Sequence, residues 1–519
     1  MERRGFLGAV VAAGAAIVTG CSSDPEASPS NTAAPTTAAP STTTSTTTTT
    51  TVPTTTVPTT TVATAAPVVE PAGLVLPAPP TSDTWWLNNH FAPVDGEFES
   101  TDLVVRGTIP EALNGTWVRN GPNPPNGESI HWFDGDGMVH GLRLRGGEAD
   151  WYGRKYLQTP FTAPDADPAA LAVPGREITR SNVSFVQHGG RLLSLGEVGF
   201  PYEVDPADLS TVGPYDFDGA LQTAMTAHPK IDPATGEMYF FGYDFREPYL
   251  TYHVADASGL LTRSVPIGLA NAPMMHDFAI TTESVIFMDL GIRFDLAAGI
   301  SFPFLFDRDF PCRIGVMPRD STTDAVRWFD VDSSFVFHTV NAHQSGQIVT
   351  LDAIRYPELW TESPTEEFSP AVPYRYEIDL KSGSVTEGPL DDRWVEFPMI
   401  DRDRMTGRQH SISWTADIGP TTEAPRASTI VQHRADGSSD SAASYMLPDN
   451  DVAGEPMFVA DPDGSAEGDG WIFLAVYRSE SHRSDVVILD ARDVAGGPVA
   501  SIELPVRVPE GFHAAWSPA

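Results

Sequence analysis

Short runs of apolar or alternating residues recur from about residue 85 to the end of the chain. Clear examples are residues 191–198, 237–245, 284–290, 346–354, 374–380, 470–478 and 484–491. Turn-forming segments such as DPATGE, DLKSGS and DPDGSAEGDG separate them, and long helical periodicity is nearly absent. This spacing predicts an all-β fold: a sandwich, a barrel or a propeller. About 440 residues favour a propeller, although no repeat period shows the number of blades.

The first residues of the chain follow a different pattern. Arg3 and Arg4 precede an apolar Ala/Val/Gly stretch that ends in Val-Thr-Gly-Cys21. A membrane span needs roughly 20 apolar residues, so this stretch is more typical of a twin-arginine export signal. Its ending resembles a lipoprotein cleavage box. We therefore expect residues 1–21 to be a signal peptide and a lipidated Cys21 to anchor the protein to the outer face of a bacterial cell membrane. Simple secretion is the alternative.

Residues 22–80 consist mainly of Ser, Thr, Pro and Ala. Such a segment cannot bury enough apolar surface to offset the entropy lost on ordering. We expect a disordered tether, followed by one folded domain over residues 81–519.

Charge and cysteine content exclude several classes of partner and site. Nearly all of the net charge of −37 lies beyond residue 70. An acidic surface repels phosphate backbones, so nucleic acid is not an expected partner. The chain has two cysteines, Cys21 and Cys312, which provide neither a disulfide framework nor a thiolate metal site.

Four of the thirteen histidines share a setting among apolar or small neighbours at the edges of strand-like runs. They are His228, His276, His338 and His513. Their spacing alone is a weak metal signal, because no local motif such as His-Glu-x-x-His occurs. Each could equally be an ordinary packed side chain.

Three glutamates also have apolar surroundings: Glu197, Glu396 and Glu455. Glutamate is seldom buried unless paired, and a carboxylate commonly accepts the outer N–H of a metal-bound imidazole. The histidines and glutamates would thus make a complete metal site. Alternatively, each glutamate caps a turn or accepts backbone N–H groups.

Several longer motifs make the sequence similar to a known family. They include GTWVRNGPNPPNGESIHWFDGDGMVHGLRL (115–144), MMHDFAITTESVIFMD, FVFHTVNAHQ, WVEFPMIDR and GEPMFVADPDGSAEGDGWIF. From about residue 85 onward, the chain closely resembles the carotenoid cleavage oxygenases, which include stilbene-cleaving dioxygenases and a retinoid isomerase. The resemblance implies a seven-bladed β-propeller with one Fe(2+) on its axis and O2 as co-substrate.

The resemblance also assigns roles to the seven residues. It implies that His228, His276, His338 and His513 bind the iron. Glu197, Glu396 and Glu455 would then support His276, His338 and His513, respectively. Four neutral imidazoles leave the metal its full charge, and the affinity order of divalent metals would not by itself select iron.

Other positions leave alternatives open. The sequence after His338 reads Asn-Ala-His-Gln where the family usually has an aromatic residue and Glu, so His343 could be exposed, line a tunnel or compete as a ligand. A Phe-rich stretch contains Phe302, Phe304, Phe306 and Phe310. These residues could belong to the core. Alternatively, they could form the mouth of a substrate tunnel and an apolar patch that faces a membrane. HWFDGDGMVHG (131–141) is interpreted as a tight turn, with His131 and His140 structural.

Three functions are compatible with these residues. The first is oxidative cleavage of a C=C bond in a carotenoid or apocarotenoid to carbonyl products. The second is cleavage of a stilbene-like phenolic, for which Tyr152, Lys155 and Tyr156 could hold the phenol. The third is a non-catalytic binding propeller, which would have no need for four histidines and three glutamates.

Overall fold

The computed structural model describes residues 82–163, 176–295, 303–361, 369–419, 426–435, 443–448 and 450–519. The expected signal peptide (1–21), the expected tether (22–80) and Phe302 lie outside these residues. Helices in the described ranges are short: η1 (Ser82–Leu87), η2 (Asn89–Phe91), α3 (Arg402–Met405) and η5 (Val494–Gly496). Over the same ranges, none is long and apolar enough to cross a membrane.

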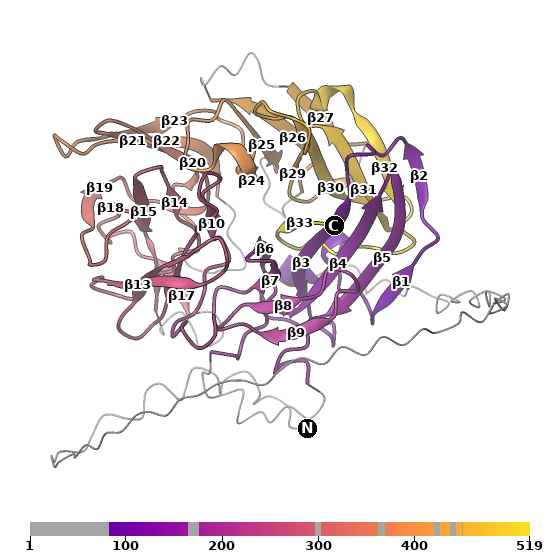
Figure 1. Ribbon diagram of the computed structural model, residues 1–519, viewed down its shortest axis with the longest axis horizontal. Helices are drawn as coiled ribbons and strands as arrows, with labels where there is room; N and C mark the ends of the chain where they lie inside the picture. The colour runs from indigo at the N-terminus through magenta and orange to yellow at the C-terminus, as the bar shows by residue number, and fades with distance from the viewer. Residues whose placement is uncertain are drawn as a thin grey trace, which may run out of the picture. The chain divides into compact units, whose positions relative to one another are not determined.

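Within the described residues, strands form eight sheets, and seven of them surround a central axis as the blades of a propeller (Figure 1). From the inside outward, blade 1 is β33 (Ala514–Pro518), β3 (Gly115–Asn123), β4 (Asp136–Arg145), β5 (Glu148–Tyr156) and β1 (Phe98–Ser100). Blade 2 is β6 (Ser184–His188), β7 (Arg191–Leu195), β8 (Tyr202–Val204) and β9 (Thr211–Pro214). Blade 3 is β10 (Lys230–Ile231), β11 (Met238–Tyr243), β12 (Leu250–Ala255) and β13 (Leu261–Ile267).

The remaining blades follow in chain order. Blade 4 is β14 (Ala279–Ile280), β15 (Ser284–Asp289), β18 (Arg313–Pro318) and β19 (Arg327–Asp330), with a separate hairpin β16 (Ile292–Phe294) and β17 (Phe304–Phe306). Blade 5 is β20 (Phe335–Ser345), β21 (Ile348–Tyr356), β22 (Val372–Asp379) and β23 (Val385–Pro389). Blade 6 is β24 (Val395–Met399), β25 (Ile412–Asp417), β26 (Thr429–Arg434) and β27 (Ala443–Met446). Blade 7 is β28 (Val452–Ala453) and β29 (Met457–Ala460), then β30 (Gly470–Arg478), β31 (Arg483–Asp490), β32 (Pro498–Glu503) and β2 (Val104–Gly107).

The two ends of the propeller interlock. The C-terminal strand β33 pairs with β3 in blade 1, while the N-terminal strand β2 pairs with β32 in blade 7. Each end thus completes a blade built mainly from the opposite end of the chain. These pairings also cover backbone edges that would otherwise be open to association.

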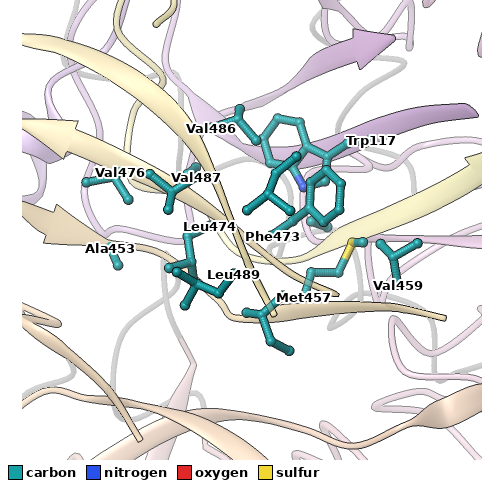
Figure 2. Close-up of a cluster of buried hydrophobic side chains, with 14 of the residues drawn as sticks. Trp117, Ala453, Met457, Val459, Phe473, Leu474, Val476, Val486, Val487 and Leu489 are labelled. Atoms are coloured by element: carbon teal, nitrogen blue, oxygen red, sulfur yellow. The ribbon is translucent and has the colours of Figure 1, made fainter. Parts of the chain in front are cut away.

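Alternating apolar residues of neighbouring blades form the core between them. Figure 2 shows Trp117 of β3 beside Met457 and Phe473 of blade 7. Trp117 is 1% exposed, and Phe473 is fully buried. Fully burying one such apolar side chain contributes roughly 1.5–3 kcal/mol, so these contacts stabilise the packing of one blade against the next.

Two segments predicted from the sequence differ from the structure in part of their length. The run 191–198 stops being a strand at Leu195, and Glu197 adopts a left-handed backbone conformation with φ of 58°. The segment 131–141 is not a turn throughout, because β4 begins at Asp136 and pairs with β3. Its apolar Met138 and Val139 are buried, which explains why this half is a strand.

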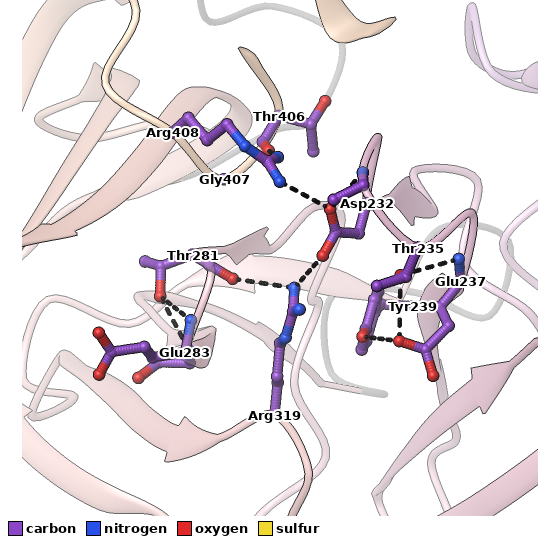
Figure 3. A network of polar contacts seen from close by, with 12 residues as sticks. Asp232, Thr235, Glu237, Tyr239, Thr281, Glu283, Arg319, Thr406, Gly407 and Arg408 are labelled. Atoms are coloured by element: carbon purple, nitrogen blue, oxygen red, sulfur yellow. Dashed lines mark hydrogen bonds and ion pairs between the residues drawn. The ribbon is translucent and has the colours of Figure 1, made fainter. Parts of the chain in front are cut away.

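A buried carboxylate ties three blades together where β10 ends. Asp232 accepts from Arg319, at 2.6 Å, and from Arg408, at 3.1 Å (Figure 3). Arg319 follows β18 of blade 4, and Arg408 lies between β24 and β25 of blade 6. Burial raises the pKa of Asp232, but backbone and arginine hydrogen bonds outweigh it and lower the pKa. The carboxylate is therefore ionised at neutral pH.

Candidate metal centre

Four histidines from four different blades meet at the axis. They are His228, just before β10; His276, just before β14; His338, within β20; and His513, just before β33. All four are buried, and their ligand atoms lie within 4.8 Å of one another. The separations between Nε2 atoms are 2.9 Å for His228 and His276, 3.3 Å for His276 and His338, and 3.2 Å for His338 and His513.

The other three blades supply the three glutamates. Glu197 follows β7 in blade 2, Glu396 lies on β24 in blade 6, and Glu455 lies between β28 and β29 in blade 7. Every blade therefore contributes one histidine or one glutamate. Glu396 and Glu455 are buried, whereas the side chain of Glu197 is 16% exposed.

Each glutamate contacts the outer ring nitrogen of one histidine. Glu197 contacts Nδ1 of His276. The corresponding distances are 2.5 Å from Glu396 to His338 and 2.9 Å from Glu455 to His513. When Nδ1–H donates to the carboxylate, Nε2 keeps its lone pair for the centre. These three pairs are the ones that the family resemblance implies.

Further donors hold the carboxylates. Glu396 accepts from the hydroxyl of Tyr356 at 2.7 Å and from its neighbouring backbone N–H at Phe397, also at 2.7 Å. The hydroxyl of Tyr243 lies near Glu197, whose charge acts on it. Burial and the adjacent carboxylates raise the pKa of both tyrosines well above 10, so each hydroxyl remains a donor.

Glu455 is held by the backbone instead of a tyrosine. Its second oxygen accepts from the N–H of Ala514 at 2.8 Å. Ala514 is the first residue of β33 and directly follows His513. The position of the imidazole and that of its carboxylate partner are therefore fixed by the same strand.

The charges in the centre suit a cation. Burial and the neighbouring histidines lower the pKa of His228 well below its usual value. Burial likewise lowers the pKa of His513 to about 4, against the opposing effect of Glu455. Burial raises the pKa values of Glu396 and Glu455, but their histidine partners and further donors outweigh it, so both are lowered. At neutral pH, the imidazoles of His228 and His513 are thus neutral, and the carboxylates of Glu396 and Glu455 are anionic.

His276 differs from His228 and His513 in the direction of its pKa shift. Burial lowers its pKa, but the charge and hydrogen bond of Glu197 outweigh that effect, and the net pKa is raised. A proton therefore competes with the metal more strongly at His276 than at His228 or His513.

The donor set fits a divalent transition metal. Four imidazole nitrogens converge, and imidazole suits Fe, Zn, Cu and Ni, whereas Mg and Ca prefer oxygen ligands. Carboxylate partners on three of the imidazoles match the usual arrangement around metal-bound histidine. The residues present therefore fit a non-haem metal site.

Aromatic side chains pack against three of the four histidines. Phe337 packs edge-on against His276, with ring centroids 5.2 Å apart. Phe397 lies 5.6 Å from both His338 and His513. Phe133 extends this wall by contacting Phe337 at 6.1 Å and Phe512 at 5.3 Å. Sequence reasoning did not assign these residues, although each lies beside a ligand, a supporting glutamate or the HWFDGDG motif.

His343 lies on β20 but outside the group of four histidines. Its side chain is half-buried, and its pKa is lowered first by burial, with Asp352 and Arg375 among its charged neighbours. The alternative in which His343 competes as a ligand receives no support from this position. Its role as a tunnel-lining donor stays a prediction.

The Phe-rich stretch contributes to packing. Phe306 is buried in the core shared by blades 4 and 5, while Phe304 and Phe310 are partly buried against it. The guanidinium of Arg293 lies 4.0 Å from the ring centre of Phe310. A role of these residues in a tunnel or at a membrane stays a prediction.

The residues suggested for holding a phenol are engaged elsewhere. Tyr152 is fully buried, and its hydroxyl lies 2.8 Å from Nδ1 of His140. Lys155 pairs with Glu99 at 3.1 Å. The buried His140 is structural, as the sequence indicated, and Tyr152 is unavailable to a ligand.

Comparisons with known proteins agree with this architecture. The family model described as "Retinal pigment epithelial membrane protein" matches residues 91–518. A Mycobacterium tuberculosis protein named carotenoid cleavage oxygenase is 33% identical over 83% of this chain and 97% of its own length.

Two solved structures are similar along nearly their whole length. Cobalt-substituted Synechocystis apocarotenoid oxygenase has a TM-score of 0.73 and 25% identity, covering 85% of this chain and 99% of that one. Lignostilbene dioxygenase from Pseudomonas brassicacearum has a TM-score of 0.74 and 28% identity, covering 85% and 100%. With four converging histidines inside a seven-bladed propeller, the chain belongs to the carotenoid cleavage oxygenase family of non-haem iron dioxygenases.

Proposed function

We propose that this protein is an Fe(II)-dependent dioxygenase that cleaves a C=C bond in a carotenoid or apocarotenoid. The observation that carries the proposal is the buried group of four histidines, three of them backed by glutamates, within an aromatic enclosure. A relative and a solved structure with those substrate classes in their names support the choice of substrate.

His228, His276, His338 and His513 would hold the iron, which supplies the activation of dioxygen when bound. The glutamates keep three imidazoles in the tautomer that presents Nε2 to the centre. In the net reaction, one C=C bond and the O–O bond break, and each alkene carbon gains one oxygen atom. Two carbonyl products form, and no external reductant is needed.

The aromatic wall provides the apolar surroundings that this reaction requires. Phe337 and Phe397 pack against the histidine rings and present apolar surface beside the centre. An apolar polyene gains the hydrophobic contribution of burial there, and the rings restrict which double bond reaches the centre.

Cleavage of a stilbene-like phenolic is the second candidate. The similarity to lignostilbene dioxygenase favours it, since that structure matches as well as the apocarotenoid oxygenase does. A binding propeller without catalysis is disfavoured, because such a protein would not need the four converging histidines and the three glutamates that support them.

We also propose that the mature protein is exported and held at a membrane surface. The paired Arg3 and Arg4 and the Val-Thr-Gly-Cys21 ending support twin-arginine export followed by lipidation of Cys21. Residues 22–80 would then form the tether that carries the domain (81–519). This route exports folded proteins, so it suits a protein loaded with its metal in the cytoplasm.

One experiment tests the enzymatic proposal. Purified protein is assayed for iron and then incubated under ¹⁸O2 with a carotenoid panel and, separately, a stilbene panel. We expect one iron per chain and two carbonyl products from a carotenoid or apocarotenoid, both labelled before exchange with water. Products from the stilbene panel alone would establish the second candidate, and metal-free protein without products from either panel would overturn both.

A further inference from the structure

A second buried carboxylate lies directly beside the histidines and joins three of the blades that carry them. Asp277 follows His276 in the chain and is 1% exposed. Its Oδ1 pairs with the ammonium of Lys230 at 2.7 Å. Its Oδ2 accepts from both the backbone N–H and the hydroxyl of Thr339, each at 2.8 Å.

Each partner is next to a different histidine. Lys230 begins β10, two residues after His228 in blade 3, and Thr339 follows His338 in blade 5. Asp277 itself belongs to blade 4. One side chain thus connects the inner segments of three blades at the point where each presents its imidazole.

Such a connection addresses a specific problem of this centre. The ligands come from separate blades, and a productive metal site tolerates errors of only about 0.5 Å in ligand position. The three glutamates orient single rings, but each contacts only one histidine. Asp277 is placed to fix distances between ligands rather than the orientation of one of them.

We propose that Asp277, with Lys230 and Thr339, is a positioning group that holds His228, His276 and His338 at the spacing required for metal binding. It touches neither the metal nor a substrate, and it acts through the backbone of its neighbours. The inference rests on the proposed metal site.

The contacts also predict how substitution would act. In Asp277→Asn, the amide oxygen can still accept from Thr339, but Lys230 loses its counter-charge. Arg402 lies close enough to disfavour the charged Lys230 further. Lys230 would then move, and the inner segment that carries His228 would move with it.

The test is titration of metal-stripped, full-length protein with Co(II), followed by the visible absorption of the bound ion. We expect Asp277→Asn to weaken Co(II) binding by about tenfold or more and to change the ligand-field spectrum, as loss of outer contacts at metal sites does. The double variant Lys230→Gln/Asp277→Asn restores a neutral hydrogen-bonded pair, and we expect it to recover part of the affinity.

Asp232→Asn is the matched control. Asp232 is also a buried carboxylate that ties three blades together, but it lies four residues beyond His228 along the inner segment (Figure 3). We expect it to lower the melting temperature while leaving the Co(II) affinity within about twofold and the spectrum unchanged. If Asp277→Asn fails to fold, Thr339→Val, which removes one hydroxyl, is titrated in its place, with an expected loss of at least about threefold.

Equal Co(II) affinity and identical spectra for the unmodified protein and Asp277→Asn, or for Thr339→Val in its place, would overturn the inference. So would equal losses in Asp277→Asn and Asp232→Asn, because the effect would then be one of stability alone. Failure of the unmodified protein to bind Co(II) would instead overturn the proposed metal site itself.

Discussion

The imidazole of His513 links the end of the chain to the metal centre. Its Nε2 faces His338 at 3.2 Å, and its Nδ1 is held by Glu455. We expect His513→Ala to fold, because the smaller side chain leaves β33 intact, and to bind iron at least about ten- to a hundredfold more weakly. Metal analysis and product formation measure this loss.

His482→Ala serves as the control for His513→Ala. His482 contacts Tyr477 at 2.6 Å and is outside the group of four histidines. It should keep the parent iron content. A His513→Ala protein with one iron per chain and the parent turnover would contradict the ligand assignment.

Substitution of Tyr356 tests the hydrogen bonds that hold the glutamates in place. In Tyr356→Phe, one oxygen of the buried Glu396 loses its hydroxyl donor, so the carboxylate orients His338 less firmly. We expect a severalfold weaker metal affinity and a loss of stability of about 1–2 kcal/mol. Tyr252→Phe removes another tyrosine hydroxyl, which donates to the carbonyl of Arg319 away from the centre, and should lower stability without changing metal affinity.

Acid should release the metal through His276. Metal binding requires a neutral imidazole, and Glu197 raises the pKa of His276 in the metal-free protein. As pH falls through this raised pKa, a proton displaces the metal, and apparent affinity falls by about tenfold per pH unit. In Glu197→Gln, the pKa of His276 is lower, so the release midpoint should move to lower pH. A midpoint that is unchanged or higher in a pH titration with a metal-sensitive dye would contradict this account.

At the scale of elements, β33 has two tasks. It is the inner strand of blade 1, paired with β3 from Gly115 to Arg119, and it fixes both His513 and Glu455. Trp516 lies opposite Trp117 in this pairing, and its ring centroid is 5.7 Å from that of Phe473 in blade 7. The closure of the ring and the completion of the metal centre therefore depend on the same few residues.

Trp516→Ala separates these two tasks. Its side chain is partly exposed, so we expect a loss of stability of about 2–3 kcal/mol, below that of a fully buried tryptophan. The metal affinity should change little, because Ala514 keeps its N–H contact with Glu455. Thermal or denaturant unfolding measures the first effect and metal titration the second. A large loss of metal affinity with unchanged stability would contradict this division.

For the molecule as a whole, export and catalysis should be separable. We expect the Arg3→Lys/Arg4→Lys variant to remain in the cytoplasm as precursor, and Cys21→Ala to be exported but released from the membrane. Fractionation of cells followed by immunoblotting checks both outcomes. Normal export of the double-lysine variant would contradict the twin-arginine route, and membrane retention of Cys21→Ala would point to an apolar patch on the folded domain.

The sequence by itself determined the β-rich class of the fold and pointed to the residues of the centre. Strand-length apolar runs between turn formers predicted the β-rich architecture, because alternation and turn chemistry are local properties. The run over 470–478 coincides with β30. Histidines and glutamates in apolar surroundings identified the residues that the structure brings together, and the family motifs supplied their pairing.

Only the tertiary structure decided how these residues meet. Sequence spacing could not show that every blade gives one histidine or one glutamate, because His228 and His513 approach through closure of the ring. Nor could it reveal that Asp277 joins the segments of His228, His276 and His338, or that Phe397 packs against two of the histidines. These contacts connect residues far apart in the chain, so they depend on the arrangement of the blades rather than on any local pattern.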